Sequence, residues 1–264
     1  MADVTPENKD YIRWGILNVR RAELLITKAF SFFREHQIEP ILIKGWAANR
    51  FYPEDDPRAF YDTDLAVSAD DYDAAYRLIH SSEGSSLGID LHRETRHLDT
   101  LPWDDLFARC ELIDLDGVSI RVPCAEDNLR IQCVHWLNDG AEYKQRLWDI
   151  YYSVLNRPAS FDWEKCFRCV STTRQRWIIV SIGLAHRYLE LPIDDLPFAD
   201  EARQIPAWII KCVEREWKRN LRLSPLQVSI NRPKQLLRQI KKRLPPNPIQ
   251  ATVDMEGEFD NRSR

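Results

Sequence analysis

The sequence predicts an α+β fold, in which a small mixed β-sheet core flanked by helices precedes an all-helical C-terminal domain. Up to Val122, short apolar runs that end at turn-forming residues alternate with stretches of helical periodicity. From Ala125 almost to Arg243, the apolar residues keep helical spacing. We therefore expect a core domain over residues 1–123, a helical domain over 124–244 and a disordered tail over 245–264, because the tail is polar and Pro-rich at its start.

Each expected element of the core domain has a local signal. Apolar residues at helical spacing predict a helix over 10–36, and a β-rich run closed by Lys44-Gly45 predicts a buried strand over 41–43. The turn-forming dipeptide Asp116-Gly117 predicts a hairpin over 111–122. The remaining expected elements are helical turns over 46–51, a strand over 61–67, a helix over 71–80 and a strand over 86–93.

Charge is divided unevenly along the chain. The net charge is −4, but residues 203–243 carry twelve Lys or Arg against two acids, a net +10, so the rest of the chain carries −14. This segment ends in a basic amphipathic helix with Leu236, Leu237 and Ile240 on one face. Such a segment suits RNA or an anionic membrane, although a solvated or self-packed helical face would have the same composition. The sequence leaves the oligomeric state open.

The cysteines and the apolar runs indicate a cytoplasmic protein. The sequence starts without the apolar core of a signal peptide, and it contains no apolar run near the ~20 residues that span a membrane. The six cysteines are therefore expected to be reduced. Cys166 and Cys169 form a single CxxC pair, and without a second pair or spaced histidines they are interpreted as buried structural residues.

Acidic residues recur on two of the expected strands. Alternation along a strand puts Asp62 and Asp64 on one face, and it puts Asp90 and His92 on one face of the next strand. If the two strands are neighbours, the three carboxylates converge. Adjacent carboxylates repel each other unless a cation lies between them, so this pattern favours a site for Mg²⁺ or Mn²⁺. The same reasoning predicts that Asp64→Asn relieves repulsion in the metal-free protein.

Two features near these carboxylates suit a phosphate ligand. Gly45 permits close backbone approach to a phosphate, next to the cationic Lys44. Arg58 precedes Asp62 by four residues and carries the planar guanidinium that matches phosphate geometry. We therefore expect Lys44, Gly45 and Arg58 to bind substrate, with His92 supporting the metal site.

The ordered set of these motifs resembles an uncharacterised nucleotidyltransferase-like family of the DNA polymerase β nucleotidyltransferase superfamily. The matching residues, in chain order, are Lys44-Gly45, Tyr52-Pro53, Arg58, Asp62-Thr63-Asp64-Leu65-Ala66-Val67, Asp90-Leu91-His92, Glu126-Asp127, His135 and Leu147-Trp148-Asp149-Ile150. The resemblance covers residues 10–220 and differs from most of the superfamily in having Lys44-Gly45 where Gly-Ser is usual.

The resemblance implies an enzyme that moves a nucleotidyl group from a nucleoside triphosphate, with ATP expected, to an acceptor hydroxyl. It implies that Asp62, Asp64 and Asp90 hold the metal, and it places Asp149 as a further candidate for substrate binding. The acceptor stays open among small molecules, saccharides, peptides or proteins, and tRNA. The alternative is a catalytically silent nucleotide- or partner-binding module, antitoxin-like or scaffolding, which would gain support if Asp90 lay far from Asp62 and Asp64.

Overall fold

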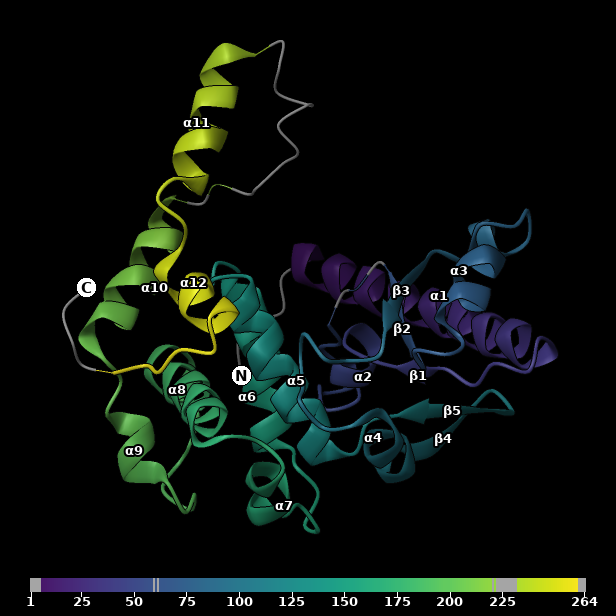
Figure 1. The fold of residues 1–264 in the computed structure, drawn as a ribbon, viewed down its shortest axis with the longest axis horizontal. Coiled ribbons are helices and arrows are strands. Elements are labelled where there is room, and N and C mark those ends of the chain that lie inside the picture. Colours follow the sequence, from purple (N-terminus) through teal and green to yellow (C-terminus); the bar gives the residue numbers. More distant parts are fainter. Residues whose placement is uncertain (1–5, 59, 61, 220, 222–231, 261–264) are drawn as a thin grey trace. The chain divides into compact units, whose positions relative to one another are not determined.

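A three-stranded mixed sheet forms the centre of the N-terminal part of the chain in the computed structural model (Figure 1). Strand β2 (Thr63–Val67) lies in the middle, antiparallel to β1 (Ile41–Leu42) and parallel to β3 (Ile89–Arg93). A separate antiparallel hairpin joins β4 (Glu111–Leu115) to β5 (Val118–Val122). The structure describes residues 6–58, 60, 62–219, 221 and 232–260. The prediction of a mixed α+β fold with a helical C-terminal part is confirmed.

Helices make up most of the remaining described chain. They are α1 (Pro6–Glu35), α2 (Gly45–Asn49), α3 (Tyr72–Ile79), α4 (Trp103–Arg109), α5 (Ala125–Asn138), α6 (Leu147–Leu155), α7 (Trp163–Arg168), α8 (Thr172–Leu189), α9 (Ala199–Arg203), α10 (Ala207–Arg219), α11 (Pro233–Arg243) and α12 (Pro248–Asp254), with 3₁₀ turns at Gly84–Leu87 and Lys144–Arg146. Within the described residues, every helix is too short or too polar to cross a lipid bilayer.

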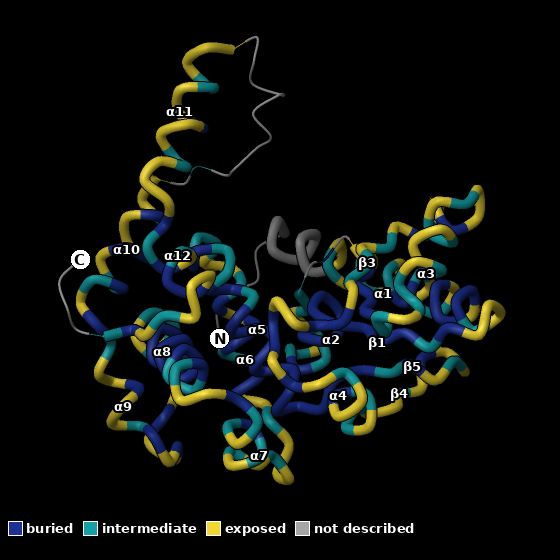
Figure 2. The backbone as a smooth tube through the Cα atoms, in the orientation of Figure 1, coloured by how far each residue is buried: buried dark blue, intermediate teal, exposed yellow. Residues whose placement is uncertain are grey.

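The central strand β2 is buried along its whole length because both faces of the sheet are covered (Figure 2). Leu65 and Val67 pack on one face with aromatic side chains of α1 such as Phe30. Ala66 points to the other face, where it packs with Leu106 of α4 and Ile131 of α5. This alternation is the two-residue period expected of a strand.

The chain divides into two compact units at places other than the predicted boundary at residue 123. The first unit comprises Met1–Gln132 with Tyr152–Val170, and the second comprises Cys133–Tyr151 with Ser171–Arg264. The first half of α5 belongs to the first unit because it contributes to that unit's core. Ile131 packs with Ile41 and Ile43, and the buried Arg130 forms an ion pair with Asp99.

Two predicted strands begin later than expected. The strand predicted over 61–67 starts at Thr63, and Tyr61 lies outside the described residues. The strand predicted over 86–93 starts at Ile89, because Gly84–Leu87 forms a 3₁₀ turn and Gly88 adopts a left-handed conformation with φ 63°. The hairpin turns at Asp116-Gly117 as predicted, and both residues have positive φ.

The prediction of a disordered tail over 245–264 is wrong for residues 245–260; residues 261–264 lie outside the described residues. Helix α12 is capped by the Asn247 side chain, which accepts hydrogen bonds from the Ile249 and Gln250 amides. Beyond α12, the indoles of Trp177 and Trp208 donate hydrogen bonds to the carbonyls of Gly257 and Asp260. The polar composition of the tail did not predict these hydrogen bonds, because their tryptophan donors lie far from the tail in the sequence.

Phe259→Ala is expected to lower the free energy of unfolding of the second unit by about 3–5 kcal/mol. Phe259 is 3% exposed, and its ring centroid lies 6.0 Å from that of Trp177 and 5.8 Å from that of Trp208. Chemical denaturation followed by tryptophan fluorescence measures the loss. Met255→Ala is the matched control, because Met255 is 69% exposed. Equal stability of the two variants would contradict the packing of the tail.

Candidate metal and phosphate site

The parallel pairing of β2 with β3 places Asp64 directly beside Asp90. Paired residues on neighbouring strands share a face of the sheet, and so do residues two apart on one strand, which adds His92 to the same group. One ligand atom from each of Asp64, Asp90 and His92 lies within 4.8 Å of the other two. The structure therefore brings together three of the residues that the strand pattern had placed on one face.

Lys44 completes this group from the end of β1. Antiparallel pairing joins Leu42 to Leu65 and continues with a hydrogen bond from the Ile43 amide to the Asp64 carbonyl, so the chain leaves β1 beside Asp64. Lys44 Nζ lies 2.8 Å from Asp64 Oδ1 and 3.1 Å from His92 Nε2. The cation expected to meet a phosphate is thus an immediate neighbour of the central carboxylate.

The Asp64 carboxylate is stabilised in its charged form. Burial alone would raise its pKa, but the hydrogen bond with His92 and the charge of Lys44 together lower the pKa to about 2. His92 Nε2 lies 3.1 Å from Asp64 Oδ1 and 3.4 Å from Asp90 Oδ2, so the imidazole bridges both carboxylates. The repulsion expected between bare carboxylates is therefore offset at Asp64, and Asp64→Asn is expected to destabilise the protein.

Asp90 differs from Asp64 in its access to solvent. Its side chain is 55% exposed, whereas the Asp64 side chain is 8% exposed. The site therefore has one buried carboxylate fixed by protein contacts and one carboxylate open to a ligand. Two carboxylates and an imidazole are a donor set that can hold a divalent cation.

The backbone at Lys44-Gly45 adopts a conformation that few residues accept. Lys44 has φ 53° and Gly45 has φ 25°, at the start of α2. A side chain at position 45 would have to take the same positive φ and would approach Asp64 Oδ2 to 3.8 Å. Strained backbone of this kind gathers at ligand sites, and here it turns the chain sharply so that the Lys44 side chain meets Asp64.

Three further predicted site residues belong to other segments of the chain. Asp62 precedes β2 in an irregular segment, is exposed and is not part of the group formed by Asp64, Asp90 and His92. Arg58 is half-buried in the loop before β2, where its amide donates to Asn49 Oδ1 at 2.7 Å. Asp149 is 2% exposed on α6 and belongs to the second unit. The strand alternation failed for Asp62 because the strand begins one residue after it.

Sequence reasoning missed His97, which stacks on His92. The two rings are 19° from parallel with centroids 5.5 Å apart. Burial lowers the pKa of His97, and the positive charges of His92 and Lys44 lower it further. His97 lies beyond the end of β3, so strand periodicity offered no signal for it.

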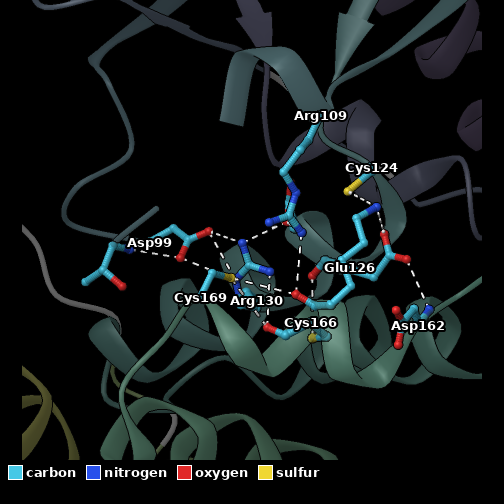
Figure 3. A network of polar contacts seen from close by, with 11 residues as sticks. Asp99, Arg109, Cys124, Glu126, Arg130, Asp162, Cys166 and Cys169 are labelled. Carbon is cyan, nitrogen blue, oxygen red and sulfur yellow. Dashed lines mark hydrogen bonds and ion pairs between the residues drawn. The ribbon is translucent and has the colours of Figure 1, made fainter. Parts of the chain in front are cut away.

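The Glu126-Asp127 element and the CxxC pair belong to a buried ionic network on α5 and α7 (Figure 3). Arg130 pairs with Asp99 at 2.6 Å and with Asp127 at 2.8 Å. Burial raises the pKa of Cys166 to about 12, so its thiol stays protonated and unreactive. Cys166 is buried as interpreted, whereas Cys169 is only half-buried, and the network serves to hold α5 in the first unit.

Comparison of the chain with protein-family models, with curated proteins and with solved structures gives no match.

Lys44→Met is expected to raise the pKa of Asp64 and to lower the free energy of unfolding by about 3–5 kcal/mol, because it leaves a buried carboxylate without its cation. In the unchanged protein, the stability from ionised Asp64 is complete above the unfolded pKa of about 3.9. That stability is lost as the pH falls through about 2. In the variant, this acid-dependent loss becomes smaller.

Carbon NMR of the Asp64 carboxyl measures its pKa. Denaturant unfolding at pH values between about 2 and about 3.9 measures the free energy of unfolding. Lys28→Met is the control, because Lys28 is exposed on α1. An Asp64 titration that is the same in both variants would show that Lys44 does not govern this carboxylate.

Proposed function

We propose that the chain transfers a nucleotidyl group from a nucleoside triphosphate, with ATP as the favoured donor, to an acceptor hydroxyl. The observation that carries the proposal is the adjacent, same-face placement of Asp64 and Asp90 on parallel strands, beside Lys44 and Gly45. The resemblance of the ordered sequence motifs to nucleotidyltransferases of the DNA polymerase β superfamily supports the same reaction. The acceptor belongs to one of four classes: small molecules, saccharides, peptides or proteins, and tRNA.

The residues of the site fit Mg²⁺ or Mn²⁺. Asp64 and Asp90 would hold the ion through carboxylate oxygens, which these cations prefer, and substrate phosphates would complete the ligand set. A bound divalent ion would neutralise charge on the triphosphate and polarise it toward attack. His92 contacts Asp64 through Nε2 at 3.1 Å and so fixes the orientation of that carboxylate.

The remaining chemistry follows from the chain's own groups. In the transfer, the acceptor oxygen forms a bond to the α-phosphorus, and the bond to the departing pyrophosphate breaks. Asp90, as the exposed carboxylate, is the group placed to accept the proton that the hydroxyl loses. Lys44 supplies positive charge for the triphosphate, and Gly45 permits the positive φ with which the backbone turns at this point. Arg58 is proposed to contact the same phosphates.

A second candidate function rests on the Lys44–Asp64 ion pair. Because Lys44 Nζ already lies 2.8 Å from Asp64 Oδ1, an internal cation can take the place of the metal. The chain would then be a catalytically silent module that binds a nucleotide or a protein partner. Thermal unfolding with ATP, with and without Mg²⁺, separates the two candidates, since only the metal-dependent site gains stability from Mg²⁺ together with ATP.

Asp90→Asn is expected to lower nucleotidyl transfer by at least about a hundredfold, since it removes a proposed metal ligand. Because the Asp90 side chain is exposed, the substitution should leave the fold intact. Transfer is measured by incubating the full chain with labelled nucleoside triphosphates and a cell extract, and then by identifying the labelled product. Asp64→Asn should abolish transfer as well.

The matched control is Asp73→Asn, which removes an exposed carboxylate of α3 in the same unit. Asp62→Asn tests the residue that the sequence had assigned to the metal. Because Asp62 lies outside the group formed by Asp64, Asp90 and His92, we expect Asp62→Asn to lower transfer less than Asp90→Asn does. An Asp90→Asn variant as active as the Asp73→Asn control would refute the proposed site.

A further inference from the structure

Helix α11 buries two polar side chains and exposes two apolar ones, while Leu236 is half-buried, which departs from the usual arrangement of a surface helix. Gln239 is 2% exposed, and the side chain of Lys242 is 3% exposed. In contrast, Leu237 is 53%, Ile240 is 40% and Leu244, directly after the helix, is 68% exposed. Most of α11 is exposed in Figure 2. The apolar stripe therefore faces away from the side of α11 that contacts the rest of the second unit.

Ion pairs fix the rotation of α11. Lys242 Nζ lies 2.8 Å from Glu142 and also contacts Glu216 of α10, all within the second unit. Although burial alone would lower it, hydrogen bonds to these two carboxylates raise the pKa of Lys242. Arg243 donates to the backbone and side-chain oxygens of Gln239. Lys242 is thus held charged on the attached side of the helix.

The exposed charges of α11 are all basic. Lys234, Arg238 and Lys241 are exposed and lie four and three residues apart, so they form a stripe along the helix beside Leu237 and Ile240. The segment 232–247 contains no acidic residue. The outer surface of α11 therefore combines an apolar stripe with an adjoining basic stripe.

We propose that α11 docks the protein on the surface of an anionic lipid bilayer, with Leu237, Ile240 and Leu244 entering the boundary between headgroups and acyl chains. The basic stripe would lie at the level of the anionic headgroups, where each cation adds to the attraction. A bilayer surface is the occupant that uses both stripes at once. This proposal is independent of the nucleotidyl-transfer site.

Two other occupants fit the surface less well. RNA would pair with the basic stripe, but it would leave the leucines in water, and α11 offers no aromatic side chain on which bases stack. A second copy of the chain would cover the leucines, but pairing through α11 would bring two basic stripes together without an acidic partner in the segment. The combination of stripes therefore favours the bilayer.

Flotation of the full chain with vesicles tests the proposal. Vesicles of phosphatidylcholine with phosphatidylserine should bind the protein, and vesicles of phosphatidylcholine alone should bind it far less. Replacing Leu237 and Ile240 by Gln should lower the partition coefficient about tenfold or more. Replacing Lys234, Arg238 and Lys241 by Gln should lower it on the order of a hundredfold at low salt.

Matched controls use exposed residues of the first unit. Leu112→Gln removes an apolar side chain that is 58% exposed on β4, and a triple change of Arg21, Lys28 and Arg77 to Gln removes three exposed cations. Near-ultraviolet circular dichroism of each variant reports that the fold is kept. These control variants should bind vesicles like the unchanged protein.

Three outcomes would overturn the proposal. The first is that the protein binds both kinds of vesicle and that none of the α11 substitutions removes this binding. The second is the absence of binding to anionic vesicles, whether or not the protein is retained on single-stranded RNA. The third is a dimer in sedimentation experiments that the Leu237 and Ile240 changes dissociate, because it would assign the apolar stripe to a second copy.

Discussion

A carboxylate on a fully buried strand is the constraint on which the site depends. Strand β2 is covered on both faces, yet its second residue is Asp64. A buried charge is costly unless it is paired and hydrogen-bonded, so the surroundings must supply a cation within reach. Lys44, two residues after β1, and His92 on β3 meet this demand. The three-stranded order is therefore what makes a charged group tolerable at the centre of the sheet.

The same constraint explains the backbone at the start of α2. Lys44 can reach Asp64 because the chain turns sharply after β1, and the turn places Lys44 and Gly45 at positive φ. Only glycine takes such a conformation at little cost, which accounts for Gly45 at this position. The conformation of Lys44 is held by the ion pair and by the burial around it. The geometry that neutralises Asp64 also brings Lys44, His92 and the two carboxylates together.

Buried ion pairs also organise the helical parts of the molecule. In the first unit, the Arg130 guanidinium is paired with Asp99 and Asp127, and this joins the loop after β3 to α5 (Figure 3). In the second unit, Lys242 is paired with Glu142 and Glu216. Removing one partner of such a pair leaves a buried charge, so these pairs specify which face of a helix turns inward. At α11 the result is a helix that holds Lys242 inside and exposes Leu237 and Ile240.

The sequence by itself determined the features that depend on local geometry. Strand alternation placed Asp90 and His92 on one face of their strand, and turn chemistry located the hairpin at Asp116-Gly117. Both follow from the backbone periods of neighbouring residues, which a single sequence displays. The helical character of the C-terminal part followed in the same way from apolar spacing.

Only the tertiary structure decided which distant groups meet. It paired Lys44 with Asp64, excluded Asp62 from the group and packed Phe259 against Trp177 and Trp208. It also turned the leucines of α11 away from the side that Lys242 anchors, although an amphipathic pattern alone suggests that the apolar face is buried. These outcomes depend on contacts between residues far apart in the chain. Periodicity shows which residues of a helix or strand share a face. The contacts made in the folded chain determine which face is buried.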